Sequence, residues 1–154
     1  TLTRLAAAAD LPAALADELR ARNLPAAIRT GTDPLWRDLD WGGLERSKGP
    51  GRMEEPAALS RAEFALAETG TLALASGPDN PVTLTFLAET HFAAVAAADV
   101  MAGFEDFWTA WRARALDPRT INFVTGPSRS ADIGQTLQLG AHGPMALHIF
   151  LIEG

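Results

Sequence analysis

The stretch DVMAGFEDFWTAWRARALDPRTINFVT, residues 99–125, decides how the whole chain is interpreted. Its apolar side chains recur with the 3.6-residue period of a helix that starts at Asp99 and buries one face. These side chains are Phe104, Phe107, Trp108, Trp111 and Leu116. Pro118 ends the helix, and β-branched residues then favour a strand over residues 120–125. Because residues 91–97 form another apolar run, the stretch indicates the strand–helix–strand order of an α/β protein.

The N-terminal part predicts a further helix and strand. Leucines recur at every fourth position after Asp10, a residue type that caps helices, so we expect a helix that ends near Asn23. Residues 25–29 form a short apolar run and predict a strand. Trp36 and Trp41 fit either an apolar lid over the core or an exposed contact surface.

The segment RSKGPGR, residues 46–52, mixes helix and strand breakers with positive charge. It predicts a loop that extends over residues 45–56. A solvated, mobile loop is the favoured interpretation, and an anion-binding arm is the alternative.

The middle of the chain predicts a β-hairpin. Residues 71–76 and 82–87 have strand character and are separated by the strong turn signal GPDNP at 77–81. Residues 64–68 predict another strand, which Gly70 separates from the next one. Part of the sheet is therefore expected to be antiparallel.

The C-terminal part completes the predicted architecture. Residues 131–139 favour a short helix, and residues 146–152 favour a closing strand. Together the elements predict a single α/β domain, spanning 1–154, with a mixed, mainly parallel sheet flanked by helices.

The composition of the chain excludes several classes of function. The chain has 154 residues, a net charge of −6 and no cysteine. Without cysteine it has no disulfides, thiolate metal sites or thiol nucleophiles. The negative charge disfavours nucleic-acid binding, and no apolar run is long enough to span a membrane. We expect a cytoplasmic protein.

The block GPSRSADI, residues 126–133, is the first candidate site. A glycine turn after a strand, followed by hydroxyls around an arginine at a helix start, suits a carboxylate or phosphate. The candidate ligand-binding residues are Gly126, Ser128, Arg129, Ser130 and Asp132. The alternative is that a serine only caps the helix and the aspartate complements its dipole.

The block GAHGP, residues 140–144, is the second candidate site. His142 stands between two glycines in an exposed loop, where an imidazole could act as a general base or as a donor to an anion. Gly143 would let a ligand approach the backbone closely. The alternative is a loop without a function.

The block AETGT, residues 67–71, is the third candidate. It could place Glu68 in a cleft as a catalytic carboxylate, with Thr69, Gly70 and Thr71 as ligand-binding residues. The alternative is that the block forms a bulge or a tight turn. No Walker loop, Rossmann fingerprint or nucleophile elbow is present, no metal site is expected from three scattered histidines, and the cofactor is unknown.

Taken together and in this order, the blocks resemble the lactate utilization protein C family, whose domain is called the LUD domain. The resemblance is carried by AETGT, by His91 at a strand start, by GPSRSADI and by GAHGP leading into Leu147 and His148. It covers roughly residues 62–152. Ser130 stands where the family usually has threonine, and Ala88 stands where it often has proline.

The resemblance implies a fold like that of ribose-5-phosphate isomerase and the CoA transferases. It also implies a part in the bacterial oxidation of lactate to pyruvate, alongside iron–sulfur partner subunits. Residues 61–154 carry the motifs, whereas residues 1–60 resemble the family weakly. An iron–sulfur cluster on a partner agrees with a chain that lacks cysteine.

Three functions follow as expectations. The first is an accessory subunit that binds a small carboxylate or phosphate at the 126–132 and 140–144 loops. The second is a self-sufficient enzyme on a phosphorylated or CoA-linked metabolite, because Glu68 and Gly70 have the Glu-x-Gly spacing of CoA transferases. The third is a scaffold without a ligand. A homo-oligomer is compatible with each of them.

Overall fold

A six-stranded parallel sheet forms the centre of the computed structural model, which describes residues 1–53, 55–131, 137–139 and 143–154. The strand order is β1-β12-β7-β4-β2-β3, and every neighbouring pair is parallel. The strands are β1 (Leu2–Leu5), β2 (Ala27–Thr30), β3 (Glu45–Lys48), β4 (Ala57–Arg61), β7 (Thr90–Ala96) and β12 (Ala146–Ile152). The predicted α/β class with a mainly parallel sheet is confirmed.

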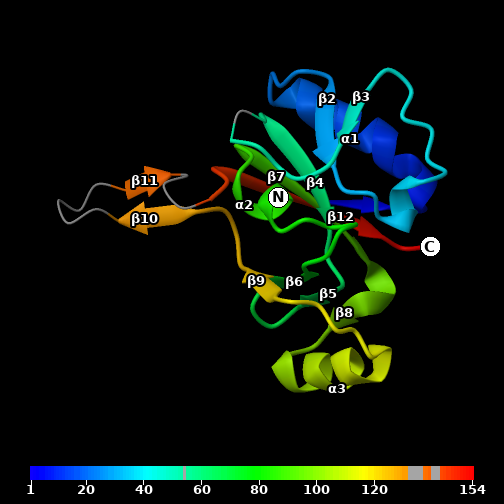
Figure 1. Cartoon of the computed structure of the whole chain (residues 1–154), viewed down its shortest axis with the longest axis vertical. Helices are drawn as coiled ribbons and strands as arrows, with labels where there is room; N and C mark the ends of the chain where they lie inside the picture. The colour runs from blue at the N-terminus through cyan, green and yellow to red at the C-terminus, as the bar shows by residue number, and fades with distance from the viewer. Residues whose placement is uncertain (54, 132–136, 140–142) are drawn as a thin grey trace.

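A second, four-stranded sheet has the order β8-β5-β6-β9. Its strands are β5 (Phe64–Leu66), β6 (Thr71–Ala75), β8 (Val100–Met101) and β9 (Ile121–Val124). β5 and β6 form an antiparallel hairpin, and β9 pairs antiparallel with β6. A third pair, β10 (Arg129–Ala131) with β11 (Leu137–Leu139), lies apart from the two larger sheets in Figure 1.

The elements stack in layers because residues on each strand alternate between two faces. Phe92 and Phe150 face α1 (Leu11–Ala21), whose leucines recur at i, i+4 and i+8 and are fully buried. Ala93 and Leu151 face the other way and pack against the four-stranded sheet. α3 (Phe104–Arg114) covers the far side of that smaller sheet (Figure 1).

Aromatic contacts and charge fix α3 on the smaller sheet. Phe64 and Phe107 meet edge to face, with ring centroids 5.5 Å apart. Arg114 in the last turn lies over the Phe64 ring, 4.2 Å from its centroid, and forms ion pairs with Glu63 and Asp99. The helix is therefore held by an apolar stripe and by one cation at its end.

Several sequence predictions are confirmed. The helix after Asp10 is α1, and the strand-like runs at 91–97, 120–125 and 146–152 are β7, β9 and β12. Trp36 is fully buried in the main core, so the prediction of a contact surface is wrong for this side chain.

The predicted hairpin of residues 71–76 and 82–87 is wrong. The second segment contains a helical turn, α2 (Thr83–Phe86), and β6 pairs with β5 and β9 instead. A four-residue apolar run does not distinguish a strand from a buried helical turn by periodicity. The loop predicted over 45–56 is also partly wrong, because its first residues form β3 at the sheet edge, where charged side chains are normal.

The long helix begins later than predicted. Asp99 lies in a 3₁₀ turn, β8 follows, and Gly103 is the N-cap of α3. The strand–helix–strand unit also differs, because β7 and β9 lie in different sheets and β9 runs antiparallel to its partner.

The helix predicted over residues 131–139 is wrong at both ends. Ala131 is paired with Leu137, and Arg129 with Leu139, in an antiparallel ladder. Residues 132–136 lie outside the described part of the chain. A nine-residue helix has little stability of its own, so strand pairing overrides the local helical preference.

Candidate functional site

A pocket of about 200 Å³ lies where the loop after β9 meets the starts of β7 and β12 and the turn of α2. Its lining residues are Thr85, Phe86, His91, Phe123, Val124, Thr125, Gly126, Pro127, Ser128, Gly143, Pro144 and Leu147. Three of them, Gly126, Ser128 and Gly143, are ligand-binding residues predicted from the sequence. The structure therefore brings together the described parts of two predicted loops.

Backbone contacts hold these two loops against each other. The N–H of Ser128 donates a hydrogen bond to the carbonyl of Pro144 at 2.8 Å. A Cβ added to Gly143 would lie 3.5 Å from the Cβ of Ser128, so the Gly143 backbone lies next to the Ser128 side chain. Gly126 has a φ of +77°, which turns the chain sharply after β9 and favours glycine there.

A chain of hydroxyls connects the pocket to the third predicted block. The Oγ1 atoms of Thr69 and Thr71 are 2.7 Å apart, and Thr71 Oγ1 lies 2.7 Å from Thr125 Oγ1. Thr71 is buried, whereas Thr125 lines the pocket. The hydroxyl of Thr125 is therefore oriented by side chains from the β5–β6 hairpin.

Glu68 does not line this pocket. Its carboxylate lies against Gly103 at the start of α3, where a Cβ on Gly103 would be 2.7 Å from Oε2. A carboxylate at a helix N-terminus interacts favourably with the helix dipole. Gly70 has a φ of +65° and open space around it, so its role is to adopt the left-handed backbone conformation of the hairpin turn.

The remaining predicted residues are placed differently. Arg129 is exposed on β10 and does not line the pocket, and Ser130 lies in the same strand. Asp132 and His142 lie outside the described residues. Because β10 occupies residues 129–131, the helix N-terminus that was expected to hold an anion next to Ser128 is not formed there.

Sequence reasoning missed the pairing of His91 with Ser60. Ser60 Oγ and His91 Nε2 are 2.5 Å apart on neighbouring strands, and both side chains are buried. Burial lowers the pKa of His91 to about 4, so the imidazole is neutral near pH 7. The available signal was the alternation along the strands, which places both residues on the face opposite α1.

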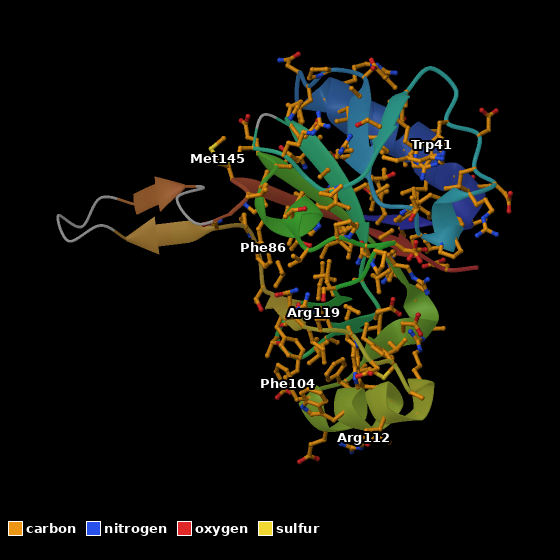
Figure 2. The ribbon with its side chains drawn as sticks, in the orientation of Figure 1. Trp41, Phe86, Phe104, Arg112, Arg119 and Met145 are labelled. Atoms are coloured by element: carbon orange, nitrogen blue, oxygen red, sulfur yellow. The ribbon has the colours of Figure 1, made fainter. Side chains whose placement is uncertain are left out.

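Hydroxyls and aromatic rings set the chemistry of the pocket. Thr85, Thr125 and Ser128 bring hydroxyls, and neutral His91 adds an imidazole whose Nε2 is already paired with Ser60. Phe86 and Phe123, both about two-fifths exposed, add apolar surface at the pocket; Figure 2 labels Phe86. The arrangement can bind a small polar molecule and orient it by hydrogen bonds.

Among the described residues no helix is long and apolar enough to cross a membrane. The same residues contain no cluster of three or more histidine, cysteine or acidic side chains arranged to hold a metal ion.

The fold and the motif-bearing loops define an α/β domain of a known family. The profile of the LUD domain family matches residues 55–152. The chain belongs to the LUD domain family.

Individual relatives support this assignment. The chain is 33% identical over 119 residues to lactate utilization protein C of Bacillus licheniformis, covering 74% of this chain and 50% of that protein. It is 38% identical over 91 residues to lactate utilization protein C of a Geobacillus species, covering 56% and 38%. It is 37% identical over 100 residues to an uncharacterized protein of Neisseria meningitidis, covering 62% and 42%.

A solved structure shares the fold. A DUF162 family protein from Deinococcus radiodurans superposes with a TM-score of 0.67 at 22% identity, covering 99% of this chain and 87% of that one. The chain spans about half or less of the length of the three curated relatives just described.

Proposed function

We propose that this LUD domain acts in lactate utilization, as an accessory subunit of a bacterial system that oxidises lactate to pyruvate, and binds a small carboxylate in the 200 Å³ pocket. The observation that carries the proposal is the meeting of the 126–128 and 143–144 loops around one pocket. The names of the curated relatives supply the pathway.

The lining chemistry suits a hydroxy acid or a keto acid. Such a ligand presents carboxylate and hydroxyl or carbonyl oxygens, which can accept hydrogen bonds from Thr85, Thr125 and Ser128. Phe86 and Phe123 can contact its carbon atoms. A pocket of about 200 Å³ lies below the volume range of sites for drug-sized ligands, which favours a molecule of a few heavy atoms.

The accessory role rests on the composition of the chain. A cluster held by cysteine thiolates needs cysteine, and this sequence has none. An iron–sulfur cluster in the pathway would therefore reside on a partner subunit, with this domain supplying a ligand-binding surface. The localisation that fits this role is the cytoplasm.

Calorimetric titration with lactate, pyruvate and phosphate tests the proposal. We expect saturable binding of lactate or pyruvate to the wild-type protein. Gly143→Leu should abolish binding, because Gly143 and Ser128 both line the pocket and a leucine side chain would start 3.5 Å from the Cβ of Ser128. Thr125→Val should weaken binding about tenfold, the usual effect of one lost hydrogen bond.

A matched control is Thr109→Val, which removes a hydroxyl from the exposed face of α3 outside the pocket. This variant should bind like the wild type. The proposed site would be contradicted if the Gly143→Leu variant bound lactate or pyruvate with the same affinity as the wild type. It would also be contradicted if the wild-type protein bound neither acid.

A further inference from the structure

Nδ1 of His91 is a buried ring nitrogen without a hydrogen-bond partner among the described residues. The residue is 1% exposed, and its one hydrogen bond to that part of the chain joins Nε2 to Oγ of Ser60 at 2.5 Å. Within the described ranges, Nε1 of Trp36 is the one fully sealed side-chain nitrogen or oxygen that lacks a partner. Nδ1 is therefore not sealed, and it reaches the 200 Å³ pocket that the His91 side chain lines.

The hydroxyl of Thr85 is placed in the same way. Thr85 is 3% exposed, lines the same pocket, and makes no side-chain hydrogen bond to the residues that the structure describes. By the same reasoning its Oγ1 is not sealed and reaches the pocket. Since buried polar groups in native proteins are hydrogen-bonded, two such groups facing one small pocket indicate a polar partner inside it.

The imidazole of His91 carries a single proton near pH 7, because burial lowers its pKa to about 4. A neutral ring has one nitrogen that donates and one that accepts. The hydrogen bond made by one nitrogen decides the state of the other. The bond between Nε2 and Ser60 therefore decides what Nδ1 presents to the pocket.

Ser60 donates its hydroxyl proton to Nε2. Ser60 is fully buried, and Nε2 of His91 is the one side-chain hydrogen-bond partner that the described residues give it. If its Oγ instead accepted a proton from Nε2–H, the hydroxyl proton would be buried without an acceptor, which is costly. Because Nε2 accepts, the ring proton is on Nδ1, and Nδ1–H is a donor directed at the pocket.

The described lining of the pocket supplies donors and no acidic acceptor. None of the described lining residues is an aspartate or a glutamate. The polar side chains of the lining are those of Thr85, His91, Thr125 and Ser128. The three hydroxyls can rotate to donate, whereas Nδ1–H can only donate. The pocket therefore matches a ligand whose oxygens only accept.

We propose that Nδ1–H of His91, held in this form by Ser60, makes the pocket select a 2-oxo carboxylate over the matching 2-hydroxy carboxylate. This selectivity rests on the function proposed for the pocket and narrows its ligand to the pyruvate type. Carbonyl and carboxylate oxygens accept from these donors without bringing a proton of their own. The hydroxyl of a 2-hydroxy acid brings a proton that needs an acceptor, and Nδ1–H provides none. Ser60 is a positioning residue, because it acts through the ring.

A purely structural role of the Ser60–His91 pair explains less. A hydrogen bond between neighbouring strands satisfies two buried side chains and holds β4 against β7. This role accounts for Oγ of Ser60 and for Nε2 of His91. It does not account for Nδ1 or for the hydroxyl of Thr85, which reach the pocket and have no partner in the described part of the chain.

NMR spectroscopy of the ¹⁵N-labelled protein at pH 7, without a ligand, tests the protonation of the ring. Long-range ¹H–¹⁵N correlations distinguish a protonated ring nitrogen from a bare one, and His91→Gln assigns the signals by their loss. We expect a protonated Nδ1 and a bare Nε2 in the wild type. In Ser60→Ala the proton is no longer fixed on Nδ1, so the form with a protonated Nε2 should become populated.

Calorimetric titration with pyruvate and lactate tests the selectivity. The wild type should bind pyruvate about tenfold more tightly than lactate, the usual effect of one unpaired polar group. Ser60→Ala should bring this ratio close to one, because a bare Nδ1 can accept the proton of the lactate hydroxyl. Ser76→Ala is the matched control, since its hydroxyl accepts from the N–H of Thr120 outside the pocket, and it should keep the wild-type ratio.

The wild-type measurements keep the test decisive if Ser60→Ala does not fold. A bare Nδ1 in the wild type would overturn the role of His91, and so would lactate binding that is as tight as pyruvate binding. An unchanged ratio in a folded Ser60→Ala variant would overturn the role of Ser60. Failure of the proposed function has a different signature, because the wild type would then bind neither acid, which overturns the selectivity as well.

Discussion

At the scale of single residues, burial sets the protonation of His91. Its imidazole is enclosed between two strands and paired with the hydroxyl of Ser60, and both residues lie beside small side chains on the sheet. Desolvation disfavours the charged form, which lowers the pKa of His91 to about 4. The pocket therefore meets a ligand near pH 7 with a neutral, oriented ring.

This burial predicts an acid-dependent loss of stability. Below pH 6.5 the unfolded chain protonates this histidine, whereas the native ring stays neutral down to about pH 4. The unfolded state then binds more protons, so the free energy of unfolding falls as the pH drops through this window, by about 3 kcal/mol in total.

Chemical denaturation from pH 7 to pH 4 checks this expectation. Carboxylates titrate in the same range, so the comparison is with His91→Gln, which keeps them all. The wild-type free energy of unfolding should fall more steeply than that of the variant. Parallel curves would mean that the ring accepts a proton in the folded protein.

At the scale of elements, the β5–β6 hairpin depends on its glycine. Gly70 adopts a φ of +65°, and an added Cβ would meet nothing within 4 Å. Gly70→Ala should therefore destabilise the protein by about 1–2 kcal/mol through left-handed backbone strain alone. The midpoint of urea unfolding measures the loss.

Gly77→Ala is the matched control. Its added Cβ also meets nothing within 4 Å, and its backbone lies outside the left-handed region. The substitution should leave stability nearly unchanged. Equal effects of the two substitutions would argue against a turn that requires positive φ at position 70.

For short helices and strands, the residue pattern of the segment was insufficient to predict the secondary structure. The segment at 82–87 has strand-like residues but contains the turn α2, and the two described ends of the helix predicted over 131–139 belong to β10 and β11. Such segments gain little from their own propensity, so the partner available in space decides their conformation. Asp132 and His142 lie outside the described residues, so their roles stay predictions.

At the scale of the whole molecule, stability is expected to differ between the layers. β7 lies between two parallel neighbours and has buried side chains on both faces, whereas β3 is a charged edge strand. Amides of β7 should exchange slowest in hydrogen–deuterium exchange, because opening them requires global unfolding. Amides of β3 should exchange orders of magnitude faster, and comparable protection of both strands would contradict this layered picture.

By itself, the sequence determined the long elements and the family. α1 and α3 have sustained 3.6-residue periods, and β7 and β12 are apolar runs long enough to cross a buried sheet. The blocks at 126–133 and 140–144 predicted one pocket, and their described parts do meet there.

Only the tertiary structure decided which strands pair, which loops meet and which side chains lose water. β9 pairs with β6 instead of β7. Ser60 on β4 contacts His91 on the neighbouring strand β7. Arg29 is buried without an acidic partner among the described residues. Each of these depends on residues far apart in the chain. The physical reason is that burial and pairing are properties of the packed layers, whereas periodicity is a property of a segment.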